Sequence, residues 1–104
     1  MTAMGNLGKT YGKFGTVIEP AGASASNLEL SGHAEERMRQ RGISKGTIRR
    51  AVENPTVVVR QRNKRVYLTE RLGVVVDPES GPRVVTVFDE FTDVVQQILR
   101  EAQP

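Results

Sequence analysis

The sequence predicts an α+β fold in which two short helices pack on an antiparallel sheet and a short helix closes the chain. Three observations lead to this prediction. Residues 31–55 show helical spacing and capping residues, residues 56–88 are rich in Val, and residues 92–102 carry an apolar stripe at helical spacing. Because the turns between the Val-rich segments are tight, we expect a four-stranded meander, or five strands if the N-terminal arm adds one.

The two predicted helices cover His33–Arg41 and Lys45–Glu53. Ser31 can cap the first helix, and Gly42 follows it as a stop signal. Apolar residues recur at helical spacing in the second helix, which ends before Pro55. Both helices are too short to be stable alone, so we expect them to pack on the sheet.

One of the predicted strands shows a clear alternation of apolar and polar residues. In the second strand, Val66 and Leu68 share one face, while Arg65, Tyr67 and Thr69 share the other, as in a half-buried antiparallel strand. Thr92 can cap the terminal helix. The four predicted strands cover residues 56–61, 65–70, 72–76 and 83–88.

The N-terminal part of the chain is interpreted as an arm and a linker, residues 1–27, ahead of a working domain, residues 28–104. The stretch Pro20–Asn27 is small, polar and rich in Pro, Gly and Ser, which is typical of a loop. Upstream of it, Thr16–Ile18 either adds an edge strand or remains mobile, and the sequence does not decide between these.

The composition limits which kinds of bond and binding site the chain can form. A chain of 104 residues without Cys has neither a disulfide framework nor a thiolate zinc site, and a single His makes a preorganised metal site unexpected. We therefore expect no metal and no cofactor. The sequence has no apolar run of about 20 residues and no signal peptide, so we expect a soluble, monomeric chain without a membrane span.

Positive charge is concentrated in the middle of the chain. Residues 31–65 hold ten Lys and Arg against three Glu, a balance of +7, whereas residues 66–104 hold three Arg against seven acids, a balance of −4. Such a block attracts polyanions such as RNA, DNA or an acidic protein. The alternative interpretation is a solvated helix surface.

The first predicted helix places His33, Arg37 and Arg41 in a row at i, i+4 spacing. An imidazole, which can transfer a proton, followed by two guanidiniums that match phosphate oxygens, is a plausible phosphodiester-cleaving face. The same spacing is common on solvated helices, so spacing alone leaves both interpretations open.

The predicted sheet supplies the remaining candidates. Thr86 and Tyr67 offer hydroxyl groups to a catalytic site, although a β-branched Thr on the surface needs no function. The first hairpin offers cations that either hold a substrate phosphate or form a polar turn. These substrate-binding candidates are Arg60, Arg62, Lys64 and Arg65.

The run Gly32-His33-Ala34-x-x-Arg37-Met38-x-x-Arg41-Gly42-Ile43-Ser44, followed by Ile48, Ala51, Val52, Asn54-Pro55 and Val85-Thr86-Val87-Phe88, resembles a group of toxin families. These are the C-terminal toxin domains of the barnase, EndoU, colicin and RelE superfamily, found in contact-dependent inhibition proteins and other polymorphic toxins. The resemblance covers residues 33–88. It implies catalytic roles for His33, Arg37, Arg41 and Thr86. Phe88 stands where related sequences often have Tyr, which leaves Tyr67 as a candidate for that phenol.

The resemblance implies an endoribonuclease that cuts tRNA or another RNA by attack of the ribose 2′-hydroxyl on phosphorus. It further implies delivery on the cell surface or by secretion, as the C-terminal part of a larger effector, action in the target-cell cytoplasm, and an acidic immunity protein as partner. Two alternatives share the same electrostatics. One is a non-catalytic nucleic-acid-binding module, and the other is a protein-interaction domain with an acidic partner.

Overall fold

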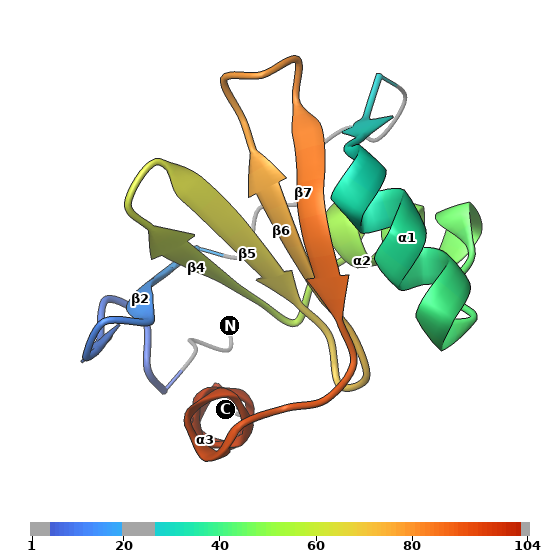
Figure 1. Cartoon of the computed structure of the whole chain (residues 1–104). Coiled ribbons are helices and arrows are strands. Elements are labelled where there is room, and N and C mark those ends of the chain that lie inside the picture. The colour runs from blue at the N-terminus through green and yellow to red at the C-terminus, as the bar shows by residue number, and fades with distance from the viewer. Residues whose placement is uncertain (1–4, 20–26, 103–104) are drawn as a thin grey trace.

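A curled sheet flanked by helices forms the structure, a computed structural model that describes residues 5–19 and 27–102 (Figure 1). The strand order across the sheet is β1-β2-β4-β5-β6-β7-β3. Along the chain the elements are β1 (Thr10–Tyr11), β2 (Gly15–Ile18), β3 (Glu29–Leu30), α1 (Gly32–Arg41), α2 (Lys45–Glu53), β4 (Val57–Gln61), β5 (Lys64–Leu68), β6 (Gly73–Asp77), β7 (Arg83–Phe88) and α3 (Asp93–Glu101).

The predicted four- or five-stranded antiparallel sheet behind two N-terminal helices is wrong. The described residues form seven strands, and the sheet is mixed because β3 runs parallel to β7. Three strands precede α1, so the helices do not open the fold. The strands β1 and β3 have two residues each, which is too short to produce a readable alternation.

The segment Thr16–Ile18, for which the sequence left two possibilities open, lies inside the sheet. It belongs to β2, which pairs with β4 so that Val17 faces Val59, and Val17 is 1% exposed. β1 then pairs with β2 and forms the sheet edge. The interpretation of residues 1–27 as arm and linker therefore needs correction for residues 10–18, while residues 20–26 lie outside the described part of the chain.

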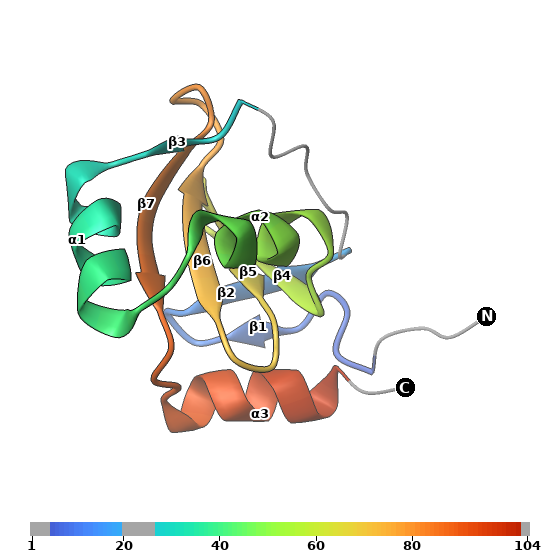
Figure 2. The same ribbon diagram turned by 90° about the vertical axis from the view of Figure 1, so that its right-hand side faces the viewer.

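Local capping explains where α1 and α2 begin and end. The Ser31 hydroxyl accepts a hydrogen bond from the Ala34 amide at 3.0 Å, and Ser44 caps α2 through the Thr47 amide at 3.2 Å. Gly42 ends α1 in the left-handed conformation, with φ of 65°, and its N–H bonds the Met38 carbonyl. The chain can therefore turn sharply from α1 into α2 (Figure 2).

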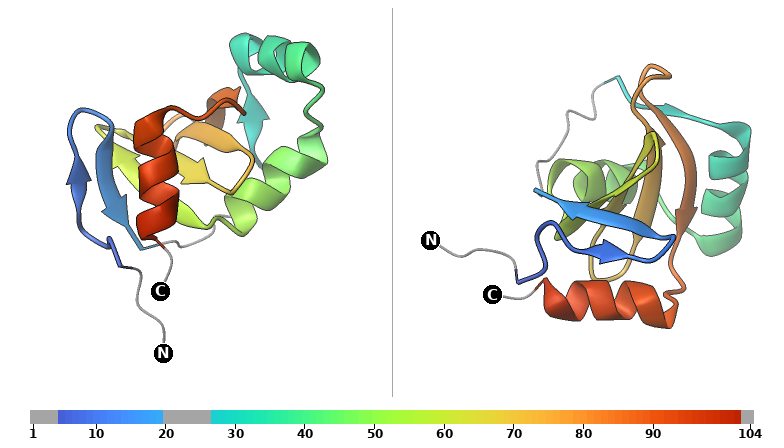
Figure 3. Two further views of the ribbon diagram at one scale, coloured as in Figure 1. Left: turned by 90° about the horizontal axis from the view of Figure 1, so that it is seen from below. Right: turned by 90° about the vertical axis from the view of Figure 1, so that its left-hand side faces the viewer.

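The sheet has an apolar core on each face. On one face, here called the α1/α2 face, Ala34, Met38 and Ile48 pack on sheet residues that include Tyr67 and Val74. Helix α3 lies on the opposite face, here called the α3 face (Figure 3). It packs there on a second set of Val and Leu side chains. This second set is Val17, Val57, Val59, Val66 and Leu68. No helix of the described residues is long and apolar enough to cross a membrane.

Candidate active site at α1 and β7

A β-bulge in β7 creates the point where α1 is attached to the sheet. Val76 pairs with Val84 while Val75 pairs with Thr86, so Val85 is an extra residue in β7. The Ser31 hydroxyl donates a hydrogen bond to the Val85 carbonyl at 2.8 Å and also caps α1. The first turn of α1 is thereby fixed beside Thr86.

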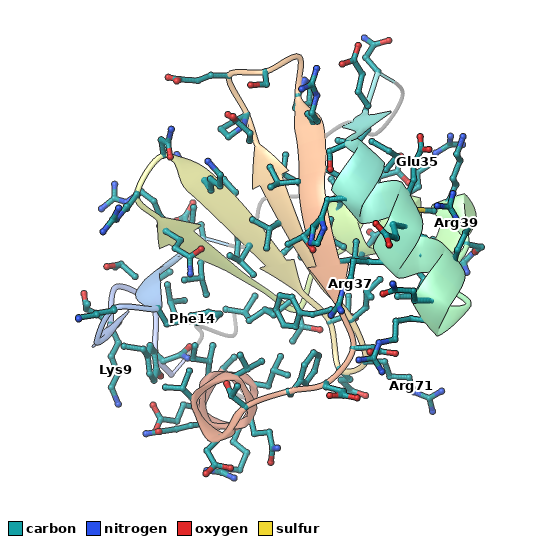
Figure 4. The ribbon with its side chains drawn as sticks, in the orientation of Figure 1. Lys9, Phe14, Glu35, Arg37, Arg39 and Arg71 are labelled. Carbon is teal, nitrogen blue, oxygen red and sulfur yellow. The ribbon has the colours of Figure 1, made fainter. Side chains whose placement is uncertain are left out.

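The buried residues of α1 decide which way the row of His33, Arg37 and Arg41 faces. Ala34 and Met38 are buried against the sheet, with exposed fractions of 0% and 8%. Arg37 points from α1 toward the carboxyl-terminal half of β7, whereas Glu35 and Arg39 point away on the other side of the helix (Figure 4). His33 lies one turn before Arg37 and is exposed. His33 and Arg37 therefore belong to a helix that packs beside β7, and Arg37 is directed toward that strand.

Thr86 lies on the α3 face of β7, beside Val75 of β6. Its side chain is half-buried, and within the described residues the hydroxyl makes one weak contact, 3.5 Å to the Val87 carbonyl. This contact is at the limit of hydrogen bonding. The hydroxyl is therefore available to donate to a bound group, which is the property that a phosphate-contacting Thr needs.

Arg41 has a different environment from Arg37, although both belong to the same row. Its Nη1 lies 2.9 Å from Glu90 Oε1, and its Nε lies 3.6 Å from Asp89 Oδ1. These carboxylates follow β7 directly, so Arg41 joins the end of α1 to the β7–α3 connection. Two carboxylates already occupy its guanidinium, and we assign it a positioning role.

Tyr67 is separated from Thr86 by the sheet itself. It belongs to the α1/α2 core together with Val58 and Val74, and it is 8% exposed. Burial raises the pKa of its phenol. Because Thr86 lies on the opposite face, Tyr67 does not take the place of the phenol that Phe88 lacks.

The structure divides the cations of the β4–β5 hairpin between the two faces of the sheet. Arg60 and Arg65 lie opposite each other in the two strands, on the α1/α2 face. Lys64 lies on the α3 face, because successive side chains of a strand point to opposite faces. Arg62 lies in the turn with a positive φ of 57°. Of the four substrate-binding candidates, Lys64 alone shares a face with Thr86.

Two residues that support the site were not found from the sequence. Asp89 and Glu90 hold Arg41, and the signal was their position directly after an apolar strand that ends near a basic helix. Ser31 was recognised only as a cap, because its second bond depends on a bulge that no local pattern predicts.

A cavity of about 570 Å³ lies between β3, α1 and α2. Glu29 and Glu35 line it together with Lys45, Arg49 and Arg83, so a phosphate there would meet carboxylates as well as cations. The lining contains neither Arg37 nor Thr86, and we do not place the reaction in it. Within residues 5–19 and 27–102, no three His, Asp or Glu side chains gather as potential metal ligands.

Comparison with protein families gives one match, to the family described as "Domain of unknown function (DUF4258)", over residues 30–98. The chain belongs to the DUF4258 family. The DUF4258 match begins at the end of β3 and stops within α3, so it includes the bulge, the α1 row and Thr86. Neither the curated proteins nor the solved structures gave a match. DUF4258 membership alone assigns no activity.

Proposed function

We propose that this DUF4258 domain is a metal-independent endoribonuclease whose reaction site is formed by His33, Arg37 and Thr86. The single observation that carries the proposal is the pair of hydrogen bonds made by Ser31. They fix α1, with the His33 imidazole and an Arg37 guanidinium that forms no ion pair among the described residues, against β7. Within the same residues the Thr86 hydroxyl of β7 has only one weak contact. This combination supplies a proton-transfer group and two anion donors at one place.

The reaction that suits these groups is transesterification within RNA. The ribose 2′-hydroxyl attacks the adjacent phosphorus, the bond to the 5′-oxygen breaks, and the products are a 2′,3′-cyclic phosphate and a 5′-hydroxyl. His33 transfers a proton, while Arg37 and Thr86 stabilise the charge that develops on the phosphorane oxygens. The nucleophile comes from the substrate, so the chain needs no Cys or Ser nucleophile.

The charge distribution supports RNA as the substrate. The +7 balance of residues 31–65 attracts a polyanion, and Arg37 of the proposed site belongs to this block. The resemblance to bacterial toxin domains supports a role in competition between bacteria. Under this proposal the domain is delivered by a larger effector and cuts tRNA or another RNA in the target cell.

The proposed partner in the producing cell is an acidic immunity protein that covers the α1 row. A nuclease of this kind would damage its own cell unless the site were blocked, and complementary acidic groups would speed the encounter. Such a partner should compete with RNA and protect α1 from hydrogen exchange. Binding confined to α3, with cleavage left intact, would contradict this part of the proposal.

Cleavage of total RNA in EDTA, followed by end-group analysis, tests the reaction. We expect cyclic phosphate ends from the parent chain and a loss of activity on the order of 10²-fold or more in His33→Ala. Gln40→Ala is the matched control, because Gln40 is an exposed residue of the same helix. Loss of cleavage in EDTA, or products with 3′-hydroxyl ends, would overturn the mechanism.

A second candidate function is RNA binding without cleavage. The observation in its favour is the cationic β4–β5 hairpin, whose positive charges do not depend on His33. It predicts salt-sensitive binding, no cyclic phosphate products and no effect of His33→Ala on affinity. The same EDTA experiment, combined with a binding measurement, separates the two candidates.

A further inference from the structure

Two arginines face each other directly in the sheet, in a position where most proteins avoid like charges. Arg60 of β4 pairs with Arg65 of β5 in the cross-strand register. Side chains directly opposite each other are about 5 Å apart at Cβ, and like charges in such a pair are destabilising. The arrangement therefore has a cost unless an anion compensates it.

No carboxylate of the described residues compensates this pair. The ion pairs formed within residues 5–19 and 27–102 involve Lys9, Arg41 and Arg83, and neither Arg60 nor Arg65. The neighbours in register are uncharged, Thr16 beside Arg60 and Val76 beside Arg65. Arg65 Nη1 donates to the Lys64 carbonyl at 3.2 Å, which still leaves its other donors available.

The arginine pair lies on the face of the sheet opposite Thr86, the strand residue of the proposed reaction site. Arg60 and Arg65 follow the α1/α2 face, whereas Thr86 lies on the α3 face. β5 and β6 separate β4 from β7, so three strand spacings of about 4.8 Å give roughly 14 Å across the sheet. One nucleotide cannot contact both places.

Lys64 and Arg62 connect the two faces around the tip of the hairpin. Lys64 is on the α3 face, where its charge reaches Asp77 of β6, and Arg62 is exposed in the turn between β4 and β5. Cations thus continue from the reaction side, over the hairpin tip, to the arginine pair. The hairpin residues along this path are uncharged or cationic, and the carboxylate of Asp77 lies beside Lys64 on the neighbouring strand β6.

We infer that the β4–β5 hairpin binds the phosphodiester backbone of an RNA segment that leaves the reaction site, crosses the sheet and wraps around the hairpin to reach Arg60 and Arg65. A phosphate between the two guanidiniums replaces their repulsion with charge-assisted hydrogen bonds. The substrate is then an extended RNA of several nucleotides rather than a dinucleotide. The link to cleavage depends on the proposed function, whereas the binding itself does not.

Binding measured against salt tests this inference without requiring cleavage. The full chain carrying His33→Ala is titrated with a single-stranded RNA of about 20 nucleotides and, separately, with a trinucleotide. The variant Arg60→Gln/Arg65→Gln should bind the longer RNA about tenfold more weakly, and its salt slope should fall by about 0.7, because the pair holds one phosphate and each phosphate contact on a single strand contributes about 0.7. Trinucleotide binding, which needs only the reaction face, should change less than twofold.

The matched control is Arg71→Gln/Arg100→Gln, which removes the same charge from an exposed turn and from α3. It should leave the salt slope for the longer RNA unchanged. Removing both charges of a like-charge pair should not lower the melting temperature, so unfolding is distinguished from lost contacts. A further variant, Arg60→Lys/Arg65→Lys, should keep most of the salt slope.

An unchanged salt slope in Arg60→Gln/Arg65→Gln, or an equal fall in the control, would overturn the inference. These outcomes are independent of the proposed reaction. If the parent chain cuts no RNA but the salt slope falls in Arg60→Gln/Arg65→Gln, the proposed reaction is wrong and the inferred binding site is supported. If the parent chain cuts RNA and the salt slope of Arg60→Gln/Arg65→Gln is unchanged, the proposed reaction is supported and the inferred binding site is wrong.

Discussion

The Arg41 guanidinium lies 2.9 Å from Glu90 Oε1, across 49 positions of the sequence. Together with its second contact to Asp89, this ion pair fastens the carboxyl-terminal end of α1 to the segment that leaves β7. Ser31 fastens the other end of the helix to the bulge in β7. Helix α1 is therefore held at both ends, and Arg37 lies between the two attachments.

Arg37 and Arg41 should respond differently to the same substitution. Arg37→Gln should lower kcat/KM for RNA by about 100-fold, since it removes a donor to the developing phosphorane charge. Arg41→Gln should lower it by less than about tenfold and reduce the free energy of unfolding by at most about 1 kcal/mol, because its ion pairs are partly exposed. Steady-state kinetics and urea titration measure both effects. Equal losses of kcat/KM would contradict the division of roles.

Thr86→Val should separate the hydroxyl from the shape of the side chain. The hydroxyl makes only a 3.5 Å contact within the described residues, so its loss should shift the melting temperature very little. If it donates to the scissile phosphate, kcat should fall by about 10²-fold. The measurement is kcat at saturating RNA together with thermal unfolding. Parental activity in Thr86→Val would remove this residue from the site, and Thr86→Ser should restore part of the rate.

The Glu101 carboxylate should produce a visible acid dependence of stability. It accepts hydrogen bonds from Lys9, Tyr11 and Gln97, and these lower its pKa from an ordinary 4.5 to about 2. Since the folded pKa is the lower one, the stabilisation is fully present above about pH 4.5 and is lost as pH falls through about 2.

Thermal unfolding of the parent chain and of Glu101→Gln, compared across this pH range, checks the acid dependence. The difference in melting temperature between the two should be constant above about pH 4.5 and should shrink toward zero near pH 2. Glu70→Gln, in an exposed turn, is the control and should show no such change. A difference that persists undiminished at about pH 2 would disprove the assignment.

Gly73→Ala should destabilise the domain through a clash with Phe88. The two residues are opposite each other in β6 and β7, and a Cβ at Gly73 would lie 2.1 Å from the Phe88 ring. Displacing the ring also disturbs its edge contact with Phe91, so we expect a loss of about 1–3 kcal/mol in the free energy of unfolding. Gly32→Ala, which meets no atom within 4 Å, is the control for urea titration.

The local elements were predictable because their signals are local. Ser31, Ser44 and Gly42 marked the helix ends, and a β-prone run after a strong turn marked β7 with the bounds that the structure shows. Alternation along residues 65–70 put Tyr67 on the face opposite Val66 and Leu68, which the two cores confirm. Each of these patterns is set by residues close together in the sequence.

The sheet order and the bulge were not predictable, because they depend on contacts between distant segments. β3 has only two residues, and its parallel pairing with β7 joins Leu30 to Val84, 54 positions away. For the same reason the candidate site could be predicted only in part. The row of His33, Arg37 and Arg41 follows from helical spacing. Which arginine forms ion pairs among the described residues depends on Asp89 and Glu90, which contact Arg41.

The placement of the short strands has a practical consequence for recombinant work with this domain. β1 at one edge of the sheet and β3 at the other both come from the part of the chain before α1, and β2 covers the edge of β4. A chain shortened to the family-matched residues 30–98 would leave β4 and β7 with bare, Val-rich edges, which are templates for intermolecular pairing. It would also lose Glu101, which fastens α3 to Lys9 and Tyr11. Aggregation of such a fragment during purification would then reflect uncovered strands, and an inactive fragment would say nothing about whether the intact chain cuts RNA.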